Sequence, residues 1–557
     1  MNEPDSVSAR ERRVVFIAGL VYGVSVCFWA NRNGALGIPR NDDAFYIRTA
    51  FHFAESGHFV PVSSYPTLFG QVLMSYPIIR IFGESIAALQ ILVLIVGVFA
   101  LVALYLFFRS YFAKAYSAVF VLILGFSPIF ANISISYMTD IPAFSFQIFS
   151  LFFIAKLQFA RKHNSLYFSA AALTAFVAFS IRQSGVTAVV TVFVMGFIAT
   201  RLPARLRKSI FLVNAVVLGG TASAFYYWRS LSPLYRSFPI NWEQFANPIS
   251  FVATSLATIG MTYGLYLLPV LFLVSPRGFY LRYKGSYFIS ELLLVLSVVI
   301  TFVILRPKPI GNYFSRFVPY AATVNANTSD VLSGREWQLL QVIGLIATLT
   351  FLVVMFRWSH QSFKNRTISF SGNSVIGMSF IIAIGFMAFA FEGGGFDRYG
   401  LILIPLLPAM LIKCSSDLGI LRNRFNFPAV GALLLIALFG ARSFDSSTVF
   451  DGAKWKIANQ EVKSGTNPLH IDGGYEWFAY HQTNFGTTEI DKFALWEKFR
   501  SDPEKLIPEE TNLVKDVCIV SRINKPKEND EEIRVLEETG LFGWKVQLAL
   551  QKLWECG

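Results

Sequence analysis

Four short segments carry residue types suited to moving a proton and holding a phosphate. Two of them bring carboxylates to the starts of predicted helices, and the other two bring arginines to the ends of apolar runs. They are Arg40-Asn41-Asp42-Asp43, Thr139-Asp140-Ile141-Pro142, Ile181-Arg182-Gln183-Ser184-Gly185, and the glycine-rich stretch 393–399, which ends in Asp397-Arg398-Tyr399. A carboxylate can take a proton from a hydroxyl. An arginine can bind a phosphate through two parallel hydrogen bonds.

Each segment also has a plainer interpretation. Acidic residues such as Asp42 and Asp43 are favoured at the start of any helix, and an amphipathic helix is predicted from here to Ser56. Asp140, followed by a proline, fits the same helix-start pattern. Arginines at helix mouths often extend towards lipid headgroups without any catalytic role. From the residues alone, both interpretations stay open.

The composition indicates a membrane protein. Hydrophobic residues make up 54% of the 557 residues and charged residues only 15%, against about a quarter charged in ordinary soluble chains. The net charge of +13 could suggest a nucleic-acid binder. However, Lys and Arg concentrate in alternate short connections between apolar runs, which is typical of cytoplasmic loops. We therefore expect no nucleic-acid partner.

The apolar runs predict about thirteen membrane-spanning helices, since a span needs roughly 20 mostly apolar residues. The fold class expected is an all-α polytopic membrane protein, with a membrane domain over residues 1–441 and a soluble α/β domain over 442–557. The predicted spans are 14–30, 86–108, 115–131, 141–157, 165–181, 184–200, 209–227, 250–274, 286–305, 339–356, 373–391, 399–413 and 427–441.

The charge distribution predicts a cytoplasmic N-terminus and an extracytoplasmic C-terminal domain in the inner or plasma membrane. In the C-terminal domain, we expect a helix over 455–462 and strands over 468–472 and 514–520. The long polar loops and most acids of the membrane domain then fall on the outer side. Only Glu291 falls within a predicted span, which argues against an ion pathway through the membrane.

The ordered set of motifs resembles the GT-C class of membrane glycosyltransferases. The closest likenesses are the protein O-mannosyltransferases and the bacterial transferase that moves aminoarabinose onto lipid A. The resemblance rests on the acidic pair Asp42-Asp43, the stretch 66–83, Thr139-Asp140-Ile141-Pro142, and Arg398-Tyr399 before Pro405 and Pro408. It covers most of the chain, including the span count and the outer domain.

This resemblance implies an inverting transfer of a sugar from a polyprenyl-phosphate donor to a lipid, glycan or protein acceptor, beside membrane lipids. It makes Asp42 the general base, with Asp43 and Asp140 as further catalytic acids. It assigns the donor phosphate to four residues: Arg182, Arg398, Tyr399 and Arg316. The chain departs from the lipid A transferase at Ser64 and Tyr65, where that family has an acidic-basic pair. This leaves the donor contacts and any metal ligand there open.

No cofactor is predicted with certainty, and a divalent metal requirement stays open. His52, Glu55 and His58 could place metal ligands on one helix face, although a solvated polar face is the simpler interpretation. Cys518 and Cys556 could form a disulfide in an oxidising compartment. Adjacent aspartates do not face each other on a helix, so Asp42 and Asp43 are not a glycosidase pair.

Two other functions remain as alternatives. A lipid or polysaccharide transporter or flippase would require polar residues inside several spans, which the sequence lacks. A membrane-anchored binding protein would need far fewer spans than the apolar runs predict. The sugar, the acceptor and the oligomeric state are not indicated by the sequence.

Overall fold

The structure is a computed structural model of the chain. It describes residues 7–60, 67–159, 164–198, 248–275, 313–316, 331–364, 374–392, 397–422, 426–468, 471–481, 519–524 and 532–555, together with isolated positions in 208–227 and 291–296.

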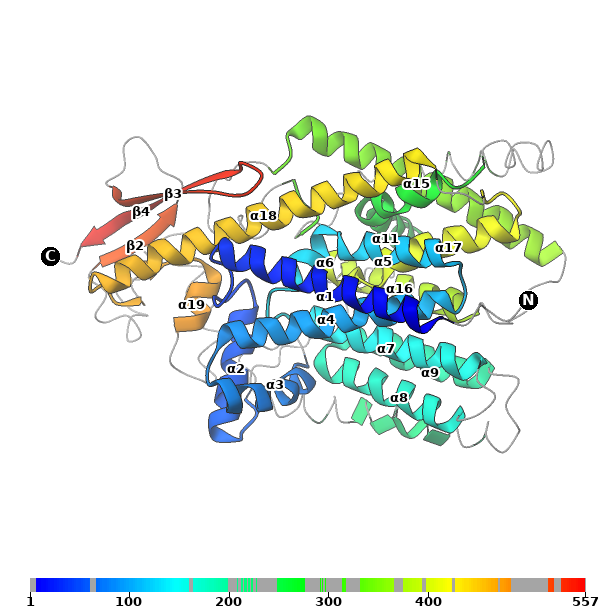
Figure 1. Ribbon diagram of the computed structural model, residues 1–557, viewed down its shortest axis with the longest axis horizontal. Coiled ribbons are helices and arrows are strands. Elements are labelled where there is room, and N and C mark those ends of the chain that lie inside the picture. The colour runs from blue at the N-terminus through cyan, green and yellow to red at the C-terminus, as the bar shows by residue number, and fades with distance from the viewer. Residues whose placement is uncertain are drawn as a thin grey trace.

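The described part is mostly helical, and its long helices run side by side along the long axis of the molecule (Figure 1). Within the described residues, five helices are long and apolar enough to cross a membrane: α1 (Ala9–Arg32), α4 (Ile86–Arg109), α7 (Asp140–Phe159), α15 (Gly334–Lys364) and α18 (Phe427–Lys463). Shorter helices lie among them: α5 (Lys114–Gly125), α8 (Asn164–Ile181), α9 (Val186–Ile198), α11 (Pro248–Tyr263), α16 (Ser374–Glu392) and α17 (Leu403–Asp417). The polytopic all-α architecture is thus confirmed in outline, while the number thirteen stays a prediction.

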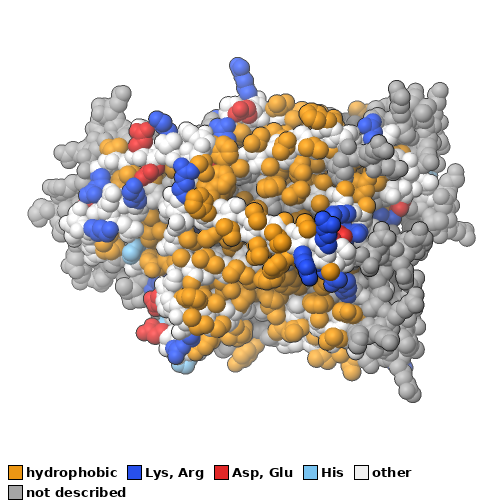
Figure 2. Space-filling model, viewed as in Figure 1, with side chains coloured by type: hydrophobic (Ala, Val, Ile, Leu, Met, Phe, Trp, Pro, Cys, Tyr) orange, Lys and Arg blue, Asp and Glu red, His pale blue; other side chains and the backbone are white. Residues whose placement is uncertain are grey.

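The surface of this helical layer is apolar. In Figure 2, hydrophobic side chains cover the middle of the visible face, and charged side chains gather towards its two ends. Exposed residues on α1 and α18 include Val24, Phe28 and Leu438. Such side chains would be unfavourable in water, so this layer fits the hydrocarbon region of a bilayer.

Two predicted spans are interrupted. The run 115–131 divides into α5 and the short α6 (Pro128–Ile133), because Ser127 caps α6 and Pro128 has no N–H to continue the previous helix. The run 250–274 divides into α11, the 3-10 turn η3 (Gly264–Leu267) and α12 (Leu268–Leu271). The predicted spans 209–227 and 286–305 lie partly outside the described residues.

Two helices form the polar end of the bundle after α1. α2 (Asp43–Ser56) is the predicted amphipathic helix, and α3 (Phe69–Phe82) follows it. The start of α3 is bound to the end of α8: the Leu68 N–H donates to the Ile181 carbonyl at 2.9 Å, and the Thr67 hydroxyl donates to the Phe179 carbonyl at 2.7 Å. These contacts connect α3 to the turn that carries Arg182.

The C-terminal sheet lies beyond this end of the bundle, opposite to the N-terminus (Figure 1). Its strands are β1 (Ile471–Asp472), β2 (Ile519–Asn524), β3 (Glu532–Thr539) and β4 (Lys545–Glu555). They lie in the order β1-β2-β4-β3; β1 is parallel to β2 and the other pairs are antiparallel. A short helix, α19 (Tyr475–His481), follows β1.

α18 connects the two parts without a break. It continues from the apolar bundle to Lys463, through the predicted boundary at 441, and includes the predicted helix 455–462. The helix continues because 442–463 has no proline or glycine pair to end it, and every residue from Ser443 to Trp455 is buried. The division into domains at 441 stays a prediction. The predicted strands 468–472 and 514–520 overlap β1 and β2, although residues 501–518 lie outside the described part.

Candidate active site

Two arginines and two aspartates from four distant segments form one cluster. The Arg398 Nη2 lies 2.8 Å from the Asp42 Oδ2, and the Arg398 Nε lies 3.7 Å from the Asp140 Oδ2. The Arg182 Nη1 lies 3.0 Å from the same Asp140 oxygen. The structure therefore brings together four of the residues singled out from the sequence, in the order Asp42–Arg398–Asp140–Arg182.

Local structure places each member at the end of an element. Asp42 precedes the first residue of α2, and Asp140 begins α7. Arg182 lies between α8 and the 3-10 turn η1 (Gln183–Gly185), with extended backbone. Arg398 lies in η5 (Asp397–Gly400), directly before α17. All four side chains of the cluster therefore come from residues at or next to the ends of helices.

The members differ in their access to solvent. The side chains of Asp140, Arg182 and Arg398 are at most 9% exposed, whereas that of Asp42 is 27% exposed. Asp42 is therefore the carboxylate of this cluster that an incoming molecule can reach. The three buried side chains form a fixed arrangement of charges next to it.

Electrostatics hold the two guanidiniums in the charged form. Burial alone would lower the pKa of Arg398, but Asp42 and Asp140 outweigh it and raise that pKa above the usual arginine value. For Arg182, burial likewise acts to lower the pKa, and Asp140 raises it to above its usual value. Both arginines remain cations at every physiological pH.

Tyrosines border the cluster. The ring centre of Tyr399 lies 4.7 Å from the Arg182 guanidinium carbon and 5.8 Å from that of Arg398, within the range of cation–π attraction. Tyr46, one turn into α2, is buried, and burial together with Asp42 raises its pKa well above the usual value. The sequence interpretation placed Tyr399 near the phosphate but gave Tyr46 no role. Tyr46 could have been found from its spacing, because a residue four positions after Asp42 lies about one helical turn away from it.

Asp43 has a different environment from Asp42. It is fully buried, and its Oδ2 accepts hydrogen bonds from the Ser136 hydroxyl at 2.8 Å and the Tyr137 N–H at 3.0 Å. Its Oδ1 accepts from the Arg40 N–H. Burial raises the pKa of Asp43 to about 8, although these hydrogen bonds act in the opposite direction. Asp43 joins the start of α2 to the segment before α7, and so helps to bring Asp42 near Asp140.

Arg40 anchors the same turn to α18. Its Nε lies 2.7 Å from the Asp451 Oδ2, and its Nη2 donates to the Ser447 hydroxyl at 2.8 Å. Both members of the ion pair are 2% exposed. Between Arg40 and Asp42, Asn41 has a φ of 60°, in the left-handed region that asparagine tolerates better than most residues. The sequence contained no signal for this pair because its members lie 411 positions apart.

Asp397 fixes another segment beside the cluster. Its Oδ2 accepts from the Tyr313 N–H at 2.8 Å, and it also accepts from Phe314 N–H. Burial raises the pKa of Tyr313, although the positive charges of Arg398 and Arg40 act to lower it. Arg316 belongs to this segment, and its guanidinium lies against Gly334 at the start of α15, 3.3 Å from where a β-carbon would stand. The predicted role of Arg316 in binding the donor phosphate stays a prediction.

Metal binding has no further support in the described residues. Within them, no three side chains of His, Cys, Asp or Glu gather as ligands. His52 lies near Ser56 on α2, where the Ser56 hydroxyl also donates to the His52 carbonyl. Outside the described part lie the glycines 393–395, the residues Ser64 and Tyr65, and both Cys518 and Cys556. The predictions for them stay untested.

Residues 74–228 match the family model described as dolichyl-phosphate-mannose-protein mannosyltransferase. No curated protein matches the chain in sequence. Among solved structures, the chain is similar to ArnT from Cupriavidus metallidurans bound to undecaprenyl phosphate, with 14% identity, 97% of this chain and 98% of that chain covered, and a TM-score of 0.40. It is also similar to the oligosaccharyltransferase AglB from Archaeoglobus fulgidus in complex with an inhibitory peptide and a dolichol-phosphate, with 15% identity, coverages of 85% and 60%, and a TM-score of 0.37.

The apolar helices and the family match together make this an integral membrane protein. The match over residues 74–228 confirms the predicted resemblance to membrane glycosyltransferases of the GT-C class.

Proposed function

We propose that the protein transfers a sugar from a polyprenyl-phosphate donor to an acceptor hydroxyl, with inversion, at the outer face of the membrane. The observation that carries this proposal is the cluster in which one accessible carboxylate, Asp42, lies beside two buried arginines. The family model supports the donor class, because its description names a dolichyl-phosphate sugar.

Asp42 is proposed as the general base. It is the most accessible acid of the cluster, and among the described residues its carboxylate forms an ion pair with Arg398. Asp43 is unsuited to this role, because all its described hydrogen bonds fix neighbouring backbone and Ser136, and burial favours its protonated form. Asp140 lies between both arginines and orients them.

Arg182 and Arg398 are proposed to hold the donor phosphate. Both are buried cations, and their guanidiniums share Asp140, which keeps them within reach of one small anion. Two guanidiniums that donate hydrogen bonds in a site with little water stabilise a phosphate much more than the same groups would in solution. A phosphate at Arg398 would also compete with Asp42 for that guanidinium, so that donor binding would make the Asp42 carboxylate available.

The proposed reaction is a single displacement. The acceptor oxygen forms a bond to the anomeric carbon of the sugar while the bond from that carbon to the phosphate oxygen breaks. The phosphate leaves with the electron pair and is stabilised by the two arginines, so no acid is required to protonate it. The proton of the acceptor hydroxyl passes to Asp42. Attack from the face opposite to the leaving phosphate inverts the configuration.

The location of the cluster fits a lipid donor. Asp140 begins the apolar helix α7, Arg182 follows α8 and Arg398 precedes α17, while Asp42 precedes α2, which lies on the side of the C-terminal sheet in Figure 1. A polyprenyl chain could then lie in lipid while its phosphate reaches the arginines. The proposed topology has the N-terminus in the cytoplasm and the sheet outside, in an inner or plasma membrane, with lipids, glycans or proteins as acceptors.

The transporter alternative receives no support from the acid that lies within a predicted span. Glu291 is 7% exposed and forms an ion pair with Arg357. Such a pair neutralises a charge inside the apolar bundle rather than offering a site to a passing ion.

The donor class can be tested by mass spectrometry of the lipids that co-purify with the protein. We expect a polyprenyl-phosphate sugar with the wild-type protein and its loss with the double variant Arg182→Gln/Arg398→Gln. The matched control is Arg534→Gln, which removes an arginine from the outer sheet and should retain the lipid. Recovery of the same lipid with all three proteins would contradict the proposed phosphate site.

A further inference from the structure

The turn between β3 and β4 is the part of the C-terminal sheet that lies nearest to the membrane helices (Figure 1). The Gly540 N–H donates to the Trp544 carbonyl at 2.8 Å, and the Gly543 N–H donates to the Gly540 carbonyl at 3.0 Å. Gly543 has a φ of 71°, which favours glycine. This tight turn leaves two large apolar side chains at its tip, Leu541 and Phe542, each 48% exposed.

The tip is held at a fixed place by Asp445 of α18. The Phe542 N–H donates to the Asp445 Oδ2 at 3.1 Å. Gly540 packs so closely that a β-carbon there would lie 2.2 Å from the same oxygen. The other oxygen, Oδ1, accepts from Trp29 Nε1 at 2.8 Å and Asn33 Nδ2 at 3.0 Å, both at the end of α1.

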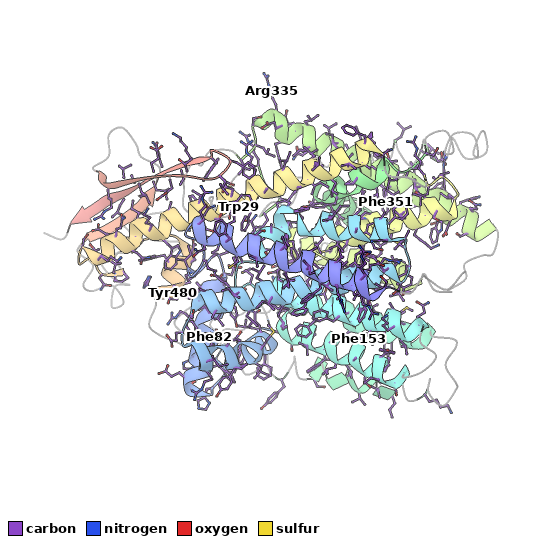
Figure 3. All side chains as sticks on the ribbon, viewed as in Figure 1. Trp29, Phe82, Phe153, Arg335, Phe351 and Tyr480 are labelled. Atoms are coloured by element: carbon purple, nitrogen blue, oxygen red, sulfur yellow. The ribbon has the colours of Figure 1, made fainter. Side chains whose placement is uncertain are left out.

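An aromatic contact adds to these hydrogen bonds. The Phe542 and Trp29 ring centres lie 5.7 Å apart. Figure 3 labels Trp29 at the end of α1 that faces the sheet, below the β3–β4 turn. Tryptophan is enriched where a helix leaves the hydrocarbon and enters the headgroup region. The tip therefore lies at the level where α1 emerges from the apolar layer.

The lipid-facing surfaces of both helices end at this same level. Phe28 on α1 is 68% exposed, and Leu438 on α18 is 61% exposed. One turn further along each helix an exposed arginine follows, Arg32 on α1 and Arg442 on α18. Apolar residues followed by arginines mark the boundary between acyl chains and phosphates.

We propose that Leu541 and Phe542 insert into the lipid bilayer at this boundary and so attach the C-terminal sheet to the membrane surface. The Phe542 ring contacts Trp29 on α1, next to the exposed Phe28. Asp445 fixes the backbone of the tip, so insertion requires no rearrangement. Arg32 and Arg442 flank it and suit lipid phosphates. This inference is independent of the proposed transfer reaction.

Spin labels provide the test. In a full-length background with all four cysteines replaced by serine, a label would be attached at Leu541→Cys or Phe542→Cys, and at Val535→Cys as the control. Val535 is 51% exposed on β3, away from the turn. The proteins would be placed in lipid nanodiscs that hold one copy each, and the collision rates of each label with oxygen and with a water-soluble nickel chelate would be measured.

Insertion predicts that the labels at 541 and 542 collide at least several-fold less with the nickel chelate, and more with oxygen, than the label at 535. Equal nickel accessibility at 535, 541 and 542 would overturn the proposal. With one copy per nanodisc, protection by a second copy is excluded, and purified protein excludes an unrelated partner. Two label positions are used because substitution of Phe542 removes its ring contact with Trp29, whereas substitution of Leu541 leaves it intact.

Discussion

The guanidinium of Arg398 joins two carboxylates, Asp42 at 2.8 Å and Asp140 at 3.7 Å, and one of these is accessible while the other is buried. This arrangement couples the proposed base to the proposed phosphate site through one side chain. A change at Arg398 should therefore affect donor binding more than folding, because Asp140 keeps its ion pair with Arg182 and the Asp42 side chain is 27% exposed.

Substitution of Arg398 by lysine tests whether the planar guanidinium is needed. Lysine keeps the charge, but its ammonium group lacks the planar set of N–H donors with which one guanidinium can contact Asp42, Asp140 and a phosphate together. We expect kcat/KM for the donor to fall by about 10²- to 10³-fold, the cost typical of removing an oriented donor to a developing charge. The measurement is steady-state transfer with purified protein at varied donor concentration. A value within twofold of wild type would contradict the phosphate role.

The buried pair Arg40–Asp451 should stabilise the protein through coupling between its members. Removing one partner leaves a buried charge and costs about 3–5 kcal/mol, whereas removing both costs less than the sum. Thermal unfolding in detergent of Arg40→Met, Asp451→Asn and the double variant would measure this.

The exposed pair Lys456–Glu538 is the matched control, because its side chains are 54% and 35% exposed. Glu538→Gln should lower the unfolding free energy by less than about 1 kcal/mol. Additive losses at Arg40 and Asp451, or a loss at Glu538 as large as theirs, would contradict the coupling.

Gly70 tests whether α3 positions Arg182. A β-carbon at Gly70 would lie 2.3 Å from the Ser180 Oγ and 2.9 Å from the Ile181 Cγ1, directly before Arg182. Gly70→Ala should push this segment away and raise the KM for the donor several-fold. Gly377→Ala on α16, where a β-carbon meets no atom within 4 Å, serves as the control. Equal KM values in the two variants would mean that α3 does not position Arg182.

The raised pKa of Asp43 should make the stability of the protein depend on pH. Its pKa is raised from an ordinary value of 3.8 to about 8 in the folded protein, chiefly by burial. The folded state therefore binds this proton more tightly than the unfolded state, and the resulting stabilisation is complete below about pH 4 and is lost as the pH rises towards 8.

In Asp43→Asn, this side chain cannot ionise. The melting temperature of wild type minus that of Asp43→Asn should thus decrease steadily from pH 5 to pH 8. Scanning calorimetry or nanoscale fluorimetry across this range would measure the difference. A difference that grows with pH would show that the hydrogen bonds from Ser136 and Tyr137 outweigh burial.

The sequence predicted the members of the cluster better than their connections. Asp42, Asp140, Arg182 and Arg398 could be singled out because scarce charges at the ends of apolar runs are visible in a single sequence. The Arg40–Asp451 pair could not, because local patterns carry no information on residues 411 positions apart. Residue patterns alone did not distinguish Asp42 from Asp43, although the resemblance made Asp42 the general base. The structure separates the two by the burial of Asp43 against Ser136.

The ends of some helices could be predicted from the sequence, and the end of α18 could not. Apolar runs located α1, α4 and α7 closely, since bilayer length determines them. The continuation of α18 to Lys463 was missed, because polar residues after 441 suggested a new domain. Their polar side chains are instead buried: Ser447 and Asp451 contact Arg40, and Asp445 contacts Trp29. Polarity in the sequence therefore reflected an internal interface rather than the end of a helix.

The central claim, that Asp42 takes the proton of the acceptor, is tested most directly by Asp42→Asn. A single-turnover measurement would follow sugar transfer from the donor bound to purified protein, with Asp417→Asn, at the Lys413 pair remote from the cluster, as the control. The account predicts that Asp42→Asn keeps the donor but transfers the sugar about 10²- to 10⁴-fold more slowly, the usual contribution of a general base, while Asp417→Asn is unaffected. Transfer at the wild-type rate by Asp42→Asn would contradict it.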